Sequence, residues 1–354
     1  MTEIEQRRLT LSARLPELKI DALLVSSSAN VRYLTGYAGS NGILLLTNGE
    51  SHFFTDPRYA LEASQRISAK VHIEKKPLLA GAVAVIKRKR LKKIGFESFS
   101  LRYEAYAKLK QELDLHPIGN VIEEQRMVKS PSELDLIRRS VATNSEAYSK
   151  TIRRVHAGAR EQDIAAELDY QMRALGAEKA AFDTIVAAGP RSALPHAQPT
   201  SHRLGENELL LIDMGASRDG YASDMTRVSH TGTPPKRILR LYKAVLEAQL
   251  AALRSIKPGI TTGEVDAAAR SVLKRHELDR AFVHSTGHGL GLEIHEPPRI
   301  ARKDKTKLRA GMAITIEPGV YIDGVGGIRI EDTVLVTEHG CEVLTPTPKD
   351  FIEL

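Results

Sequence analysis

The sequence lacks most of the features that mark a secreted, membrane-spanning or base-stacking protein. Cys341 is the only cysteine among 354 residues, so no intramolecular disulfide can form, which fits a reducing compartment. Tryptophan is absent and aromatic residues make up 5% of the chain, which argues against a surface that stacks nucleic-acid bases. The longest apolar run, residues 78–86, is too short to span a membrane, and the first ten residues are too polar and acidic for a signal peptide. We therefore expect a cytoplasmic protein that binds neither nucleic acid nor membrane.

Basic residues are in moderate excess, and the formal net charge is +7. The densest basic run, KRKRLKK at residues 87–93, follows an apolar stretch and precedes IGFE at 94–97. This order is typical of the solvated end of a helix that leads into a strand, which we favour over a binding surface. The remaining composition is that of an ordinary globular protein, and the length favours two domains.

The pattern along the chain changes near residue 125. The first third alternates strand-like apolar runs with turn-rich stretches such as residues 30–42, which predicts a small α/β domain over residues 1–125. Ser130, Pro131 and Glu133 then form a helix-start signal with a capping box. The long amphipathic helix that follows is expected to end at Gly158. We assign the second domain to residues 126–354. The strands expected in the first domain are 21–26, 42–47, 52–55 and 93–97.

Two β-rich segments of the second domain resemble each other. IDMG at 212–215 matches IEPG at 316–319, and SDMTRV at 223–228 matches IEDTVL at 330–335. In each copy an acidic residue ends an apolar strand before a glycine turn, and a second acidic residue begins the returning strand. This duplication predicts a pseudo-symmetric domain whose two halves direct carboxylates at one central site.

The repeated carboxylates belong to Asp213, Asp224, Glu317 and Glu331. Burying several unpaired carboxylates is costly, so the cluster calls for cations. A glycine-rich stretch at 284–296 adds three histidines. One imidazole with four carboxylates suits manganese, cobalt, zinc or iron, and two such ions can share and acidify a water molecule. The chemistry that these residues indicate is hydrolysis.

The chain from about residue 180 to 336 resembles the pita-bread metallopeptidases, which include methionine aminopeptidase, aminopeptidase P and prolidase. The matching motifs, in the same order and spacing, are AFDTIVAAGPRSALPHA, LLIDMGASRDGYASDMTR, HSTGHGLGLEIHE, ITIEPGVY and GGIRIEDT. Residues 1–125 resemble the creatinase/prolidase N-terminal domain at NVRYLTG and TDPRY. The resemblance implies a small α/β N-terminal domain followed by a pseudo-two-fold pita-bread catalytic domain.

The resemblance also implies a role for each matching residue. Glu317 would act as a proton shuttle as well as a ligand, and Arg329 would orient carboxylate ligands. His196 would contact the substrate, while His284 and His295 would support the scissile carbonyl or the tetrahedral intermediate. The implied ligands of two divalent ions, with Asp224 and Glu331 bridging, are Asp213, Asp224, His288, Glu317 and Glu331.

Within this group the sequence favours prolidase, an Xaa-Pro dipeptidase. The N-terminal domain speaks against methionine aminopeptidase, and the complete ligand set speaks against creatinase. Arg299, in HEPPRI, resembles an arginine with which compact prolidases hold the substrate's C-terminal carboxylate, although a surface position in a turn is the alternative. The resemblance implies proline-containing peptide substrates, two manganese ions as the first choice, and a homodimer.

Two other functions stay open. Aminopeptidase P would act on longer peptides through the same bond cleavage, in which a water shared by the metal ions attacks the scissile carbonyl. A non-catalytic pita-bread binding module is the remote alternative. Such modules typically lose metal ligands, and here only the basic run at 87–93 speaks for one.

Overall fold

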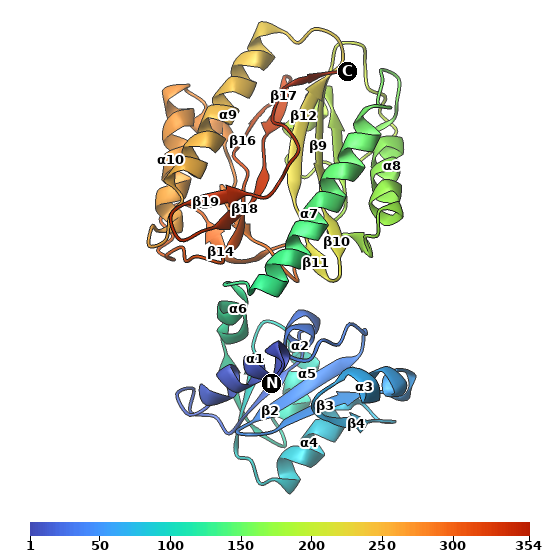
Figure 1. Ribbon diagram of the computed structural model, residues 1–354, viewed down its shortest axis with the longest axis vertical. Coiled ribbons are helices and arrows are strands. Elements are labelled where there is room, and N and C mark those ends of the chain that lie inside the picture. The colour runs from blue at the N-terminus through green and yellow to red at the C-terminus, as the bar shows by residue number, and fades with distance from the viewer. The chain divides into compact units, whose positions relative to one another are not determined.

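The computed structural model describes residues 1–354 and divides into two compact units, Met1–Arg126 and Met127–Leu354 (Figure 1). Each unit has its own hydrophobic core. None of the helices combines the length and the apolar character that a membrane crossing requires.

The N-terminal unit is built on a six-stranded mixed sheet with the strand order β4-β3-β2-β1-β5-β6. The central strands are apolar on both faces because helices cover them, and Leu24, Leu45 and Phe54 are buried among side chains of α4. The strands are β1 (Ala22–Val25), β2 (Gly42–Thr47), β3 (Ser51–Thr55), β4 (Lys70–Ile73), β5 (Lys93–Glu97) and β6 (Asp114–Ile118). The helices are α1 (Glu3–Ala13), α2 (Ser28–Thr35), η1 (Pro57–Tyr59), α3 (Ala60–Arg66), α4 (Leu78–Arg88), α5 (Tyr103–Leu109) and α6 (Val121–Arg126).

The prediction of a turn-rich stretch at residues 30–42 is wrong over its first part, because Ser28–Thr35 form the helix α2. The helix ends at Gly36, whose φ of 76° suits glycine. The polar residue Asn30 is buried inside the helix and donates a hydrogen bond of 2.6 Å to Glu97. Its side-chain oxygen accepts one of 2.6 Å from Arg126. Distant partners thus stabilise a polar residue that would locally favour a turn.

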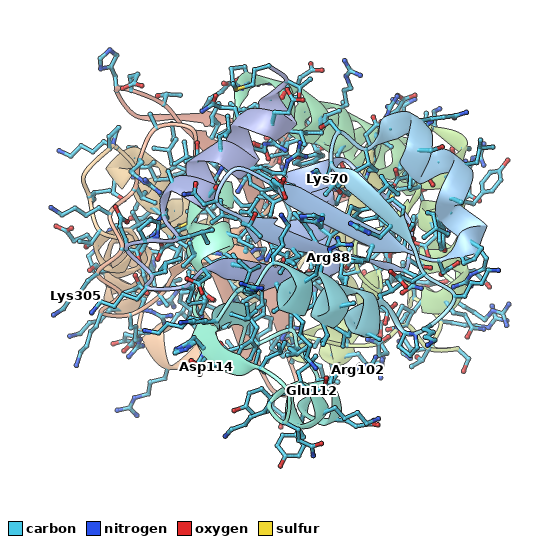
Figure 2. The ribbon with its side chains drawn as sticks, turned by 90° about the horizontal axis from the view of Figure 1, so that it is seen from below. Lys70, Arg88, Arg102, Glu112, Asp114 and Lys305 are labelled. Atoms are coloured by element: carbon cyan, nitrogen blue, oxygen red, sulfur yellow. The ribbon has the colours of Figure 1, made fainter.

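The basic run at residues 87–93 lies where the sequence predicts it, at the end of a helix that leads into a strand. Helix α4 ends at Arg88 and strand β5 begins at Lys93. Lys87 pairs with Glu112 at 2.6 Å. Figure 2 shows Arg88 and Lys70 on the same unit as the acidic Glu112 and Asp114. Charges of both signs therefore share this surface, as expected of a solvated face.

The C-terminal unit begins with the helix α7 (Pro131–Ile152), whose capping box of Ser130 and Glu133 confirms the predicted start. The predicted end at Gly158 is six residues too late. The chain leaves the helix at Arg153, and Gly158, with a φ of 91°, donates a backbone hydrogen bond to Leu204. This tertiary contact draws the chain away from the helix axis.

The core of the C-terminal unit is formed by two principal sheets, with orders β20-β12-β9-β8 and β14-β13-β15-β18-β19. Helices α7 and α8 pack on the first sheet, and α9 and α10 pack against strands of both (Figure 1). Because helices cover the strands, runs such as LLLIDM are buried along their whole length. The helices after α7 are α8 (Glu161–Ala174), η2 (Gly189–Ala193), α9 (Lys236–Ser255), α10 (Thr262–Arg275) and η3 (Asp279–Ala281).

Four strands of this unit form two matching antiparallel hairpins, in which β9 pairs with β12 and β15 pairs with β18. They are the duplicated segments that the sequence indicates. The strands are β7 (Lys179–Ala180), β8 (Ile185–Ala188), β9 (Leu209–Met214), β10 (Ala216–Arg218), β11 (Tyr221–Ala222), β12 (Met225–His230), β13 (Gly287–Gly289), β14 (Glu296–Ile300), β15 (Ala313–Ile316), β16 (Gly319–Ile322), β17 (Gly326–Arg329), β18 (Asp332–Val336), β19 (Cys341–Val343) and β20 (Ile352–Glu353).

Candidate metal centre and active site

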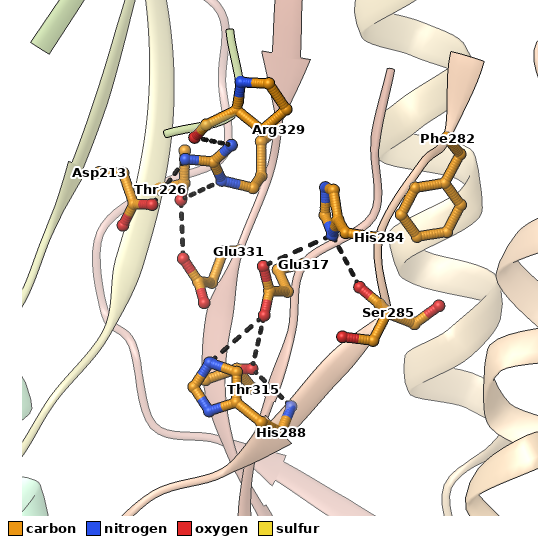
Figure 3. Close-up of polar contacts among 12 residues, drawn as sticks. Asp213, Thr226, Phe282, His284, Ser285, His288, Thr315, Glu317, Arg329 and Glu331 are labelled. Atoms are coloured by element: carbon orange, nitrogen blue, oxygen red, sulfur yellow. Dashed lines mark hydrogen bonds and ion pairs between the residues drawn. The ribbon is translucent and has the colours of Figure 1, made fainter. Parts of the chain in front are cut away.

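The two hairpins bring the four repeated carboxylates to one place. Asp213 lies near the end of β9 and Asp224 directly precedes β12, where Asp213 is in register with Thr226. Glu317 directly follows β15 and Glu331 directly precedes β18. Each antiparallel pair therefore holds its two acids at the same end of the hairpin, and all four acids line one cavity; Figure 3 shows Asp213, Glu317 and Glu331 around this site.

His288, on β13, completes this cluster. Its Nε2 lies 3.5 Å from Asp224 Oδ2 and 3.4 Å from Glu317 Oε1. Ligand atoms of Asp224, His288 and Glu331 all lie within 4.8 Å of one another. Nδ1 of His288 lies 3.0 Å from the carbonyl oxygen of Gly289. Because a carbonyl only accepts, Nδ1 carries the proton and the lone pair of Nε2 faces the carboxylates, as in a metal-ligating histidine.

The electrostatics of the cluster are unfavourable without a cation. Burial, together with the charges of Glu331, Asp213 and Glu317, raises the pKa of Asp224 well above its usual value. Burial and neighbouring carboxylates do the same to the pKa of Glu331, and burial raises the pKa of Glu317 to about 7. Burial also lowers the pKa of His288. A divalent cation would favour the ionised carboxylates and the neutral imidazole.

Two buried oxygen atoms provide a direct test of whether this cluster suits metal ions. Oδ1 of Asp213 and Oδ1 of Asp224 are buried and have no hydrogen-bond partner. A buried carboxylate oxygen without a partner is costly. Carboxylate oxygens with one imidazole nitrogen are also a donor set that divalent transition metals accept. The residues present therefore fit divalent metal ions.

Arg329, on β17, connects two of the carboxylates. Its Nη2 donates to Asp213 Oδ2 at 2.6 Å and its Nε donates to Thr226 Oγ1 at 3.1 Å. Thr226 in turn donates to Glu331 Oε2 at 2.7 Å. Arg329 Nη1 donates to the hydroxyl of Tyr321 at 2.6 Å. One planar guanidinium thus orients Asp213 directly and Glu331 through Thr226 (Figure 3).

Thr226 and Tyr321 are not among the residues predicted from sequence, although both lie in the motifs DMTR and ITIEPGVY. Thr226 follows Asp224 by two residues, as Thr333 follows Glu331 in the second copy. Thr333 Oγ1 donates to the backbone oxygen of Asp224 at 2.9 Å. The presence of this threonine in both copies was therefore a sequence signal for side chains that form hydrogen bonds from one hairpin to the other.

His284 lies beside Glu317 in a stretch without regular structure before β13. Its Nδ1 is 4.0 Å from Glu317 Oε2 and 2.8 Å from the carbonyl oxygen of Ser285. Its Nε2 is 2.8 Å from the hydroxyl of Tyr321. Since the carbonyl must accept from Nδ1, the Tyr321 hydroxyl donates to Nε2. Burial and the nearby Arg329 lower the pKa of His284 to about 4, so the ring is neutral.

The remaining predicted residues line the same cavity of about 720 Å³. The ring of His295 lies 4.4 Å from that of His288. His196 and Arg299 are exposed residues that also line the cavity. Phe182, Ile185 and other apolar residues form part of its wall. The predicted residues that share this cavity are His196, Asp213, Asp224, His284, His288, His295, Arg299, Glu317, Arg329 and Glu331.

Comparison with known proteins agrees with this geometry. Residues 135–338 match metallopeptidase family M24, and residues 7–128 match the creatinase/prolidase N-terminal domain. The chain belongs to metallopeptidase family M24 and is a peptidase with a pita-bread domain preceded by a creatinase-type domain. The family and fold class that the sequence predicts are confirmed.

Individual relatives match over nearly the whole chain. An Xaa-Pro dipeptidase of Pyrococcus horikoshii is 39% identical over 94% of this chain and 95% of its own. The structure of an Xaa-Pro dipeptidase from Bacillus anthracis has a TM-score of 0.97 at 35% identity, covering 99% of this chain and all of that one. An X-Pro aminopeptidase from Thermotoga maritima has a TM-score of 0.90 at 34% identity, covering 96% of this chain and all of the other.

Proposed function

We propose that this protein is an Xaa-Pro dipeptidase that uses two divalent metal ions per chain. The observation that carries the proposal is the convergence of five ligand-type side chains on one cavity of a family M24 chain. These are Asp213, Asp224, His288, Glu317 and Glu331. Relatives that are 37–39% identical over most of the chain bear the name Xaa-Pro dipeptidase. In this proposal residues 126–354 form the catalytic domain and residues 1–125 the N-terminal domain.

Divalent ions at these ligands would acidify a water molecule and stabilise the charge that develops on the scissile carbonyl oxygen. Glu317 takes a proton from the attacking water and delivers it to the leaving proline nitrogen. A carboxylate at this position can accept a proton and return it. The neighbouring His284, whose Nδ1 lies 4.0 Å from Glu317 Oε2, supports the tetrahedral intermediate in this proposal.

The other side chains position the reactants. Arg329 keeps Asp213 and Glu331 in orientation through the contacts given above. His196 and His295 border the cavity on the approach to the carboxylates and contact the substrate in this proposal. Manganese is the proposed native metal, with cobalt, zinc and iron as alternatives that the same donors accept. A homodimer and a cytoplasmic location stay predictions.

Arg299 supports a preference for dipeptides. Its exposed guanidinium borders the cavity and would pair with the C-terminal carboxylate that a dipeptide places next to its proline ring. The second candidate, an Xaa-Pro aminopeptidase, is favoured by the likeness to the Thermotoga maritima structure. An aminopeptidase would not need this pairing, because its substrates continue beyond proline.

The test is a comparison of Xaa-Pro dipeptides with Xaa-Pro-Yaa tripeptides in manganese, cobalt and zinc. Wild-type protein should cleave dipeptides with the higher kcat/KM, and Arg299→Ala should raise KM for dipeptides by about 10-fold or more, since an ion pair of about 1.5–3 kcal/mol is lost. Arg302→Ala, an exposed residue outside the cavity lining, is the matched control. An equal effect of Arg299→Ala on both substrate classes would favour the aminopeptidase.

A further inference from the structure

A buried ion pair on α10 contacts the chain segment that carries His284, although neither member lines the cavity. Asp266 Oδ2 accepts from Arg270 Nε at 2.7 Å, and the two side chains are 1% and 13% exposed. The other carboxylate oxygen of Asp266 accepts from Thr286 Oγ1 at 2.8 Å. The roles described above do not use this pair.

Arg270 also holds the backbone of the same segment. Its Nη1 donates to the carbonyl oxygen of Phe282 at 3.1 Å, and its Nη2 donates to that of His284. The guanidinium lies 4.1 Å from the centroid of the Phe282 ring, which meets the His284 ring edge-on at 5.0 Å. Residues 282–286 lie between η3 and β13, outside regular structure. The two carbonyls therefore depend on Arg270 rather than on a neighbouring strand.

Thr286 extends this arrangement to the proposed proton shuttle. Its carbonyl oxygen accepts from the backbone N–H of Glu317 at 2.8 Å. Asp266 and Arg270 thus hold the segment of His284, and this segment bonds through Thr286 to the backbone of Glu317, whose side chain lies 4.0 Å from that of His284. Figure 3 shows Phe282, His284 and Ser285 on one side of the site, facing Glu317.

We propose that Asp266 and Arg270 are positioning residues for catalysis, which set His284 against Glu317 from outside the cavity. This inference rests on the proposed peptidase function. All three guanidinium nitrogens of Arg270 donate hydrogen bonds: Nε donates to Asp266, and Nη1 and Nη2 donate to carbonyl oxygens. A lysine has a single point charge in place of this planar fork and cannot make the three contacts together.

The test compares Arg270→Gln and Asp266→Asn with wild type in the full-length, metal-loaded protein. On an Xaa-Pro dipeptide we expect kcat to fall about 10- to 100-fold, the usual effect of removing a partner behind a site residue, with KM changed less than about twofold. Arg270→Lys should recover only part of the loss. Arg275→Gln is the control, because Arg275 lies on the same helix as Arg270 and forms an exposed ion pair with Glu247 of α9.

Two further measurements separate positioning from a general structural role. Amide hydrogen exchange of residues 282–286 should speed up in Arg270→Gln but not in Arg275→Gln, while the metal content stays at the wild-type level. A kcat equal to that of Arg275→Gln, or a loss of metal in proportion to activity, overturns the proposal. If Arg270→Gln does not fold, Thr286→Val, which removes one hydrogen bond to Asp266, serves as the same test.

Activity of the wild-type protein alone tests the proposed function. If wild type cleaves no Xaa-Pro dipeptide with any of the metals, the proposed function fails. The exchange rates of residues 282–286 then still decide whether Asp266 and Arg270 order the His284 segment. If wild type cleaves the dipeptide and Arg270→Gln behaves as the control does, the positioning role fails and the proposed function stands.

Discussion

Carboxylate groups of the site are buried at a cost in free energy, and the contacts of each oxygen atom indicate what the group can do there. The Oδ1 atoms of Asp213 and Asp224 are buried without a hydrogen-bond partner, while Oδ2 of Asp213 is held by Arg329. Such a group retains one oriented oxygen and one free oxygen, which is the state that a metal ligand needs. The free-energy cost of burying these carboxylates is therefore tied to the function of the site.

Asp224 and Glu331, which the family resemblance implies as bridging ligands, give the first prediction at this scale. Asp224→Asn and Glu331→Gln should each remove bound metal and lower Xaa-Pro hydrolysis at least about 100-fold, because each change replaces a charged ligand with a neutral amide. Metal content after dialysis and kcat/KM are the measurements. Asp323→Asn, the same change at an exposed turn residue, should leave both at wild-type values. If either variant at a bridging position kept its metal and its activity, the proposed metal centre would be wrong.

Elements of secondary structure decide the direction in which these residues point. Strand β9 carries Asp213 on an otherwise apolar strand, and β15 leads to Glu317 in the same way. The antiparallel pairing with β12 and β18 sets the register that brings Asp224 and Glu331 to the same ends. Because side chains alternate along a strand, a shift of one residue would turn these acids away from the site.

The start of α7 gives a prediction at the scale of elements. Ser130 Oγ accepts from the backbone N–H of Glu133, and the Glu133 carboxylate accepts from the N–H of Ser130. Ser130→Ala should therefore lower the free energy of unfolding of the C-terminal unit by about 1 kcal/mol. Urea unfolding followed by circular dichroism measures this effect. Ser201→Ala, at an exposed bend, should change it little, and equal effects of the two variants would contradict the role of the cap.

On the scale of the whole molecule, the central charge cluster links stability to pH. Burial raises the pKa of Glu317 to about 7, and burial with neighbouring carboxylates raises the pKa values of Asp224 and Glu331 well above their usual values. Between about pH 4.5 and 7 these carboxyl groups therefore bind more protons in the metal-free native protein than in the unfolded chain, whereas His284 and His288, whose pKa values are lowered, bind fewer. The contribution of the carboxyl groups to stability falls as the pH rises through this range, and that of the histidines rises.

Thermal unfolding with and without metal tests this expectation. The Tm of chelator-treated wild type should decrease relative to that of Glu317→Gln from pH 5 to pH 8, because the glutamine does not titrate whereas the histidines contribute to both proteins. Added manganese should raise Tm more at pH 8 than at pH 5, because metal binding competes with protons for the same carboxylates. Asp323→Asn should follow the wild-type curve. A difference in Tm between metal-free wild type and Glu317→Gln that does not change with pH would contradict the coupling of Glu317 to stability.

Parts of this molecule could be predicted from sequence because their signals are local. The capping box at Ser130, the apolar strands that end in acidic residues and the basic end of α4 each lie within a few consecutive residues. Helix α2 was missed because Asn30 is stabilised by Glu97 and Arg126, which are distant in sequence. No local pattern reports such partners.

By itself, the sequence determined the two-domain organisation and the repeated carboxylates through local patterns, and its resemblance to a known family implied the family and the other residues that share the cavity. Only the tertiary structure decided how these residues are held. The contacts of Arg329 with Thr226 and Tyr321, and of Arg270 with the carbonyls of Phe282 and His284, join segments that meet only in the folded chain. Hydrogen-bond geometry between such segments depends on the packing of whole elements, so it follows from the fold rather than from any stretch of sequence.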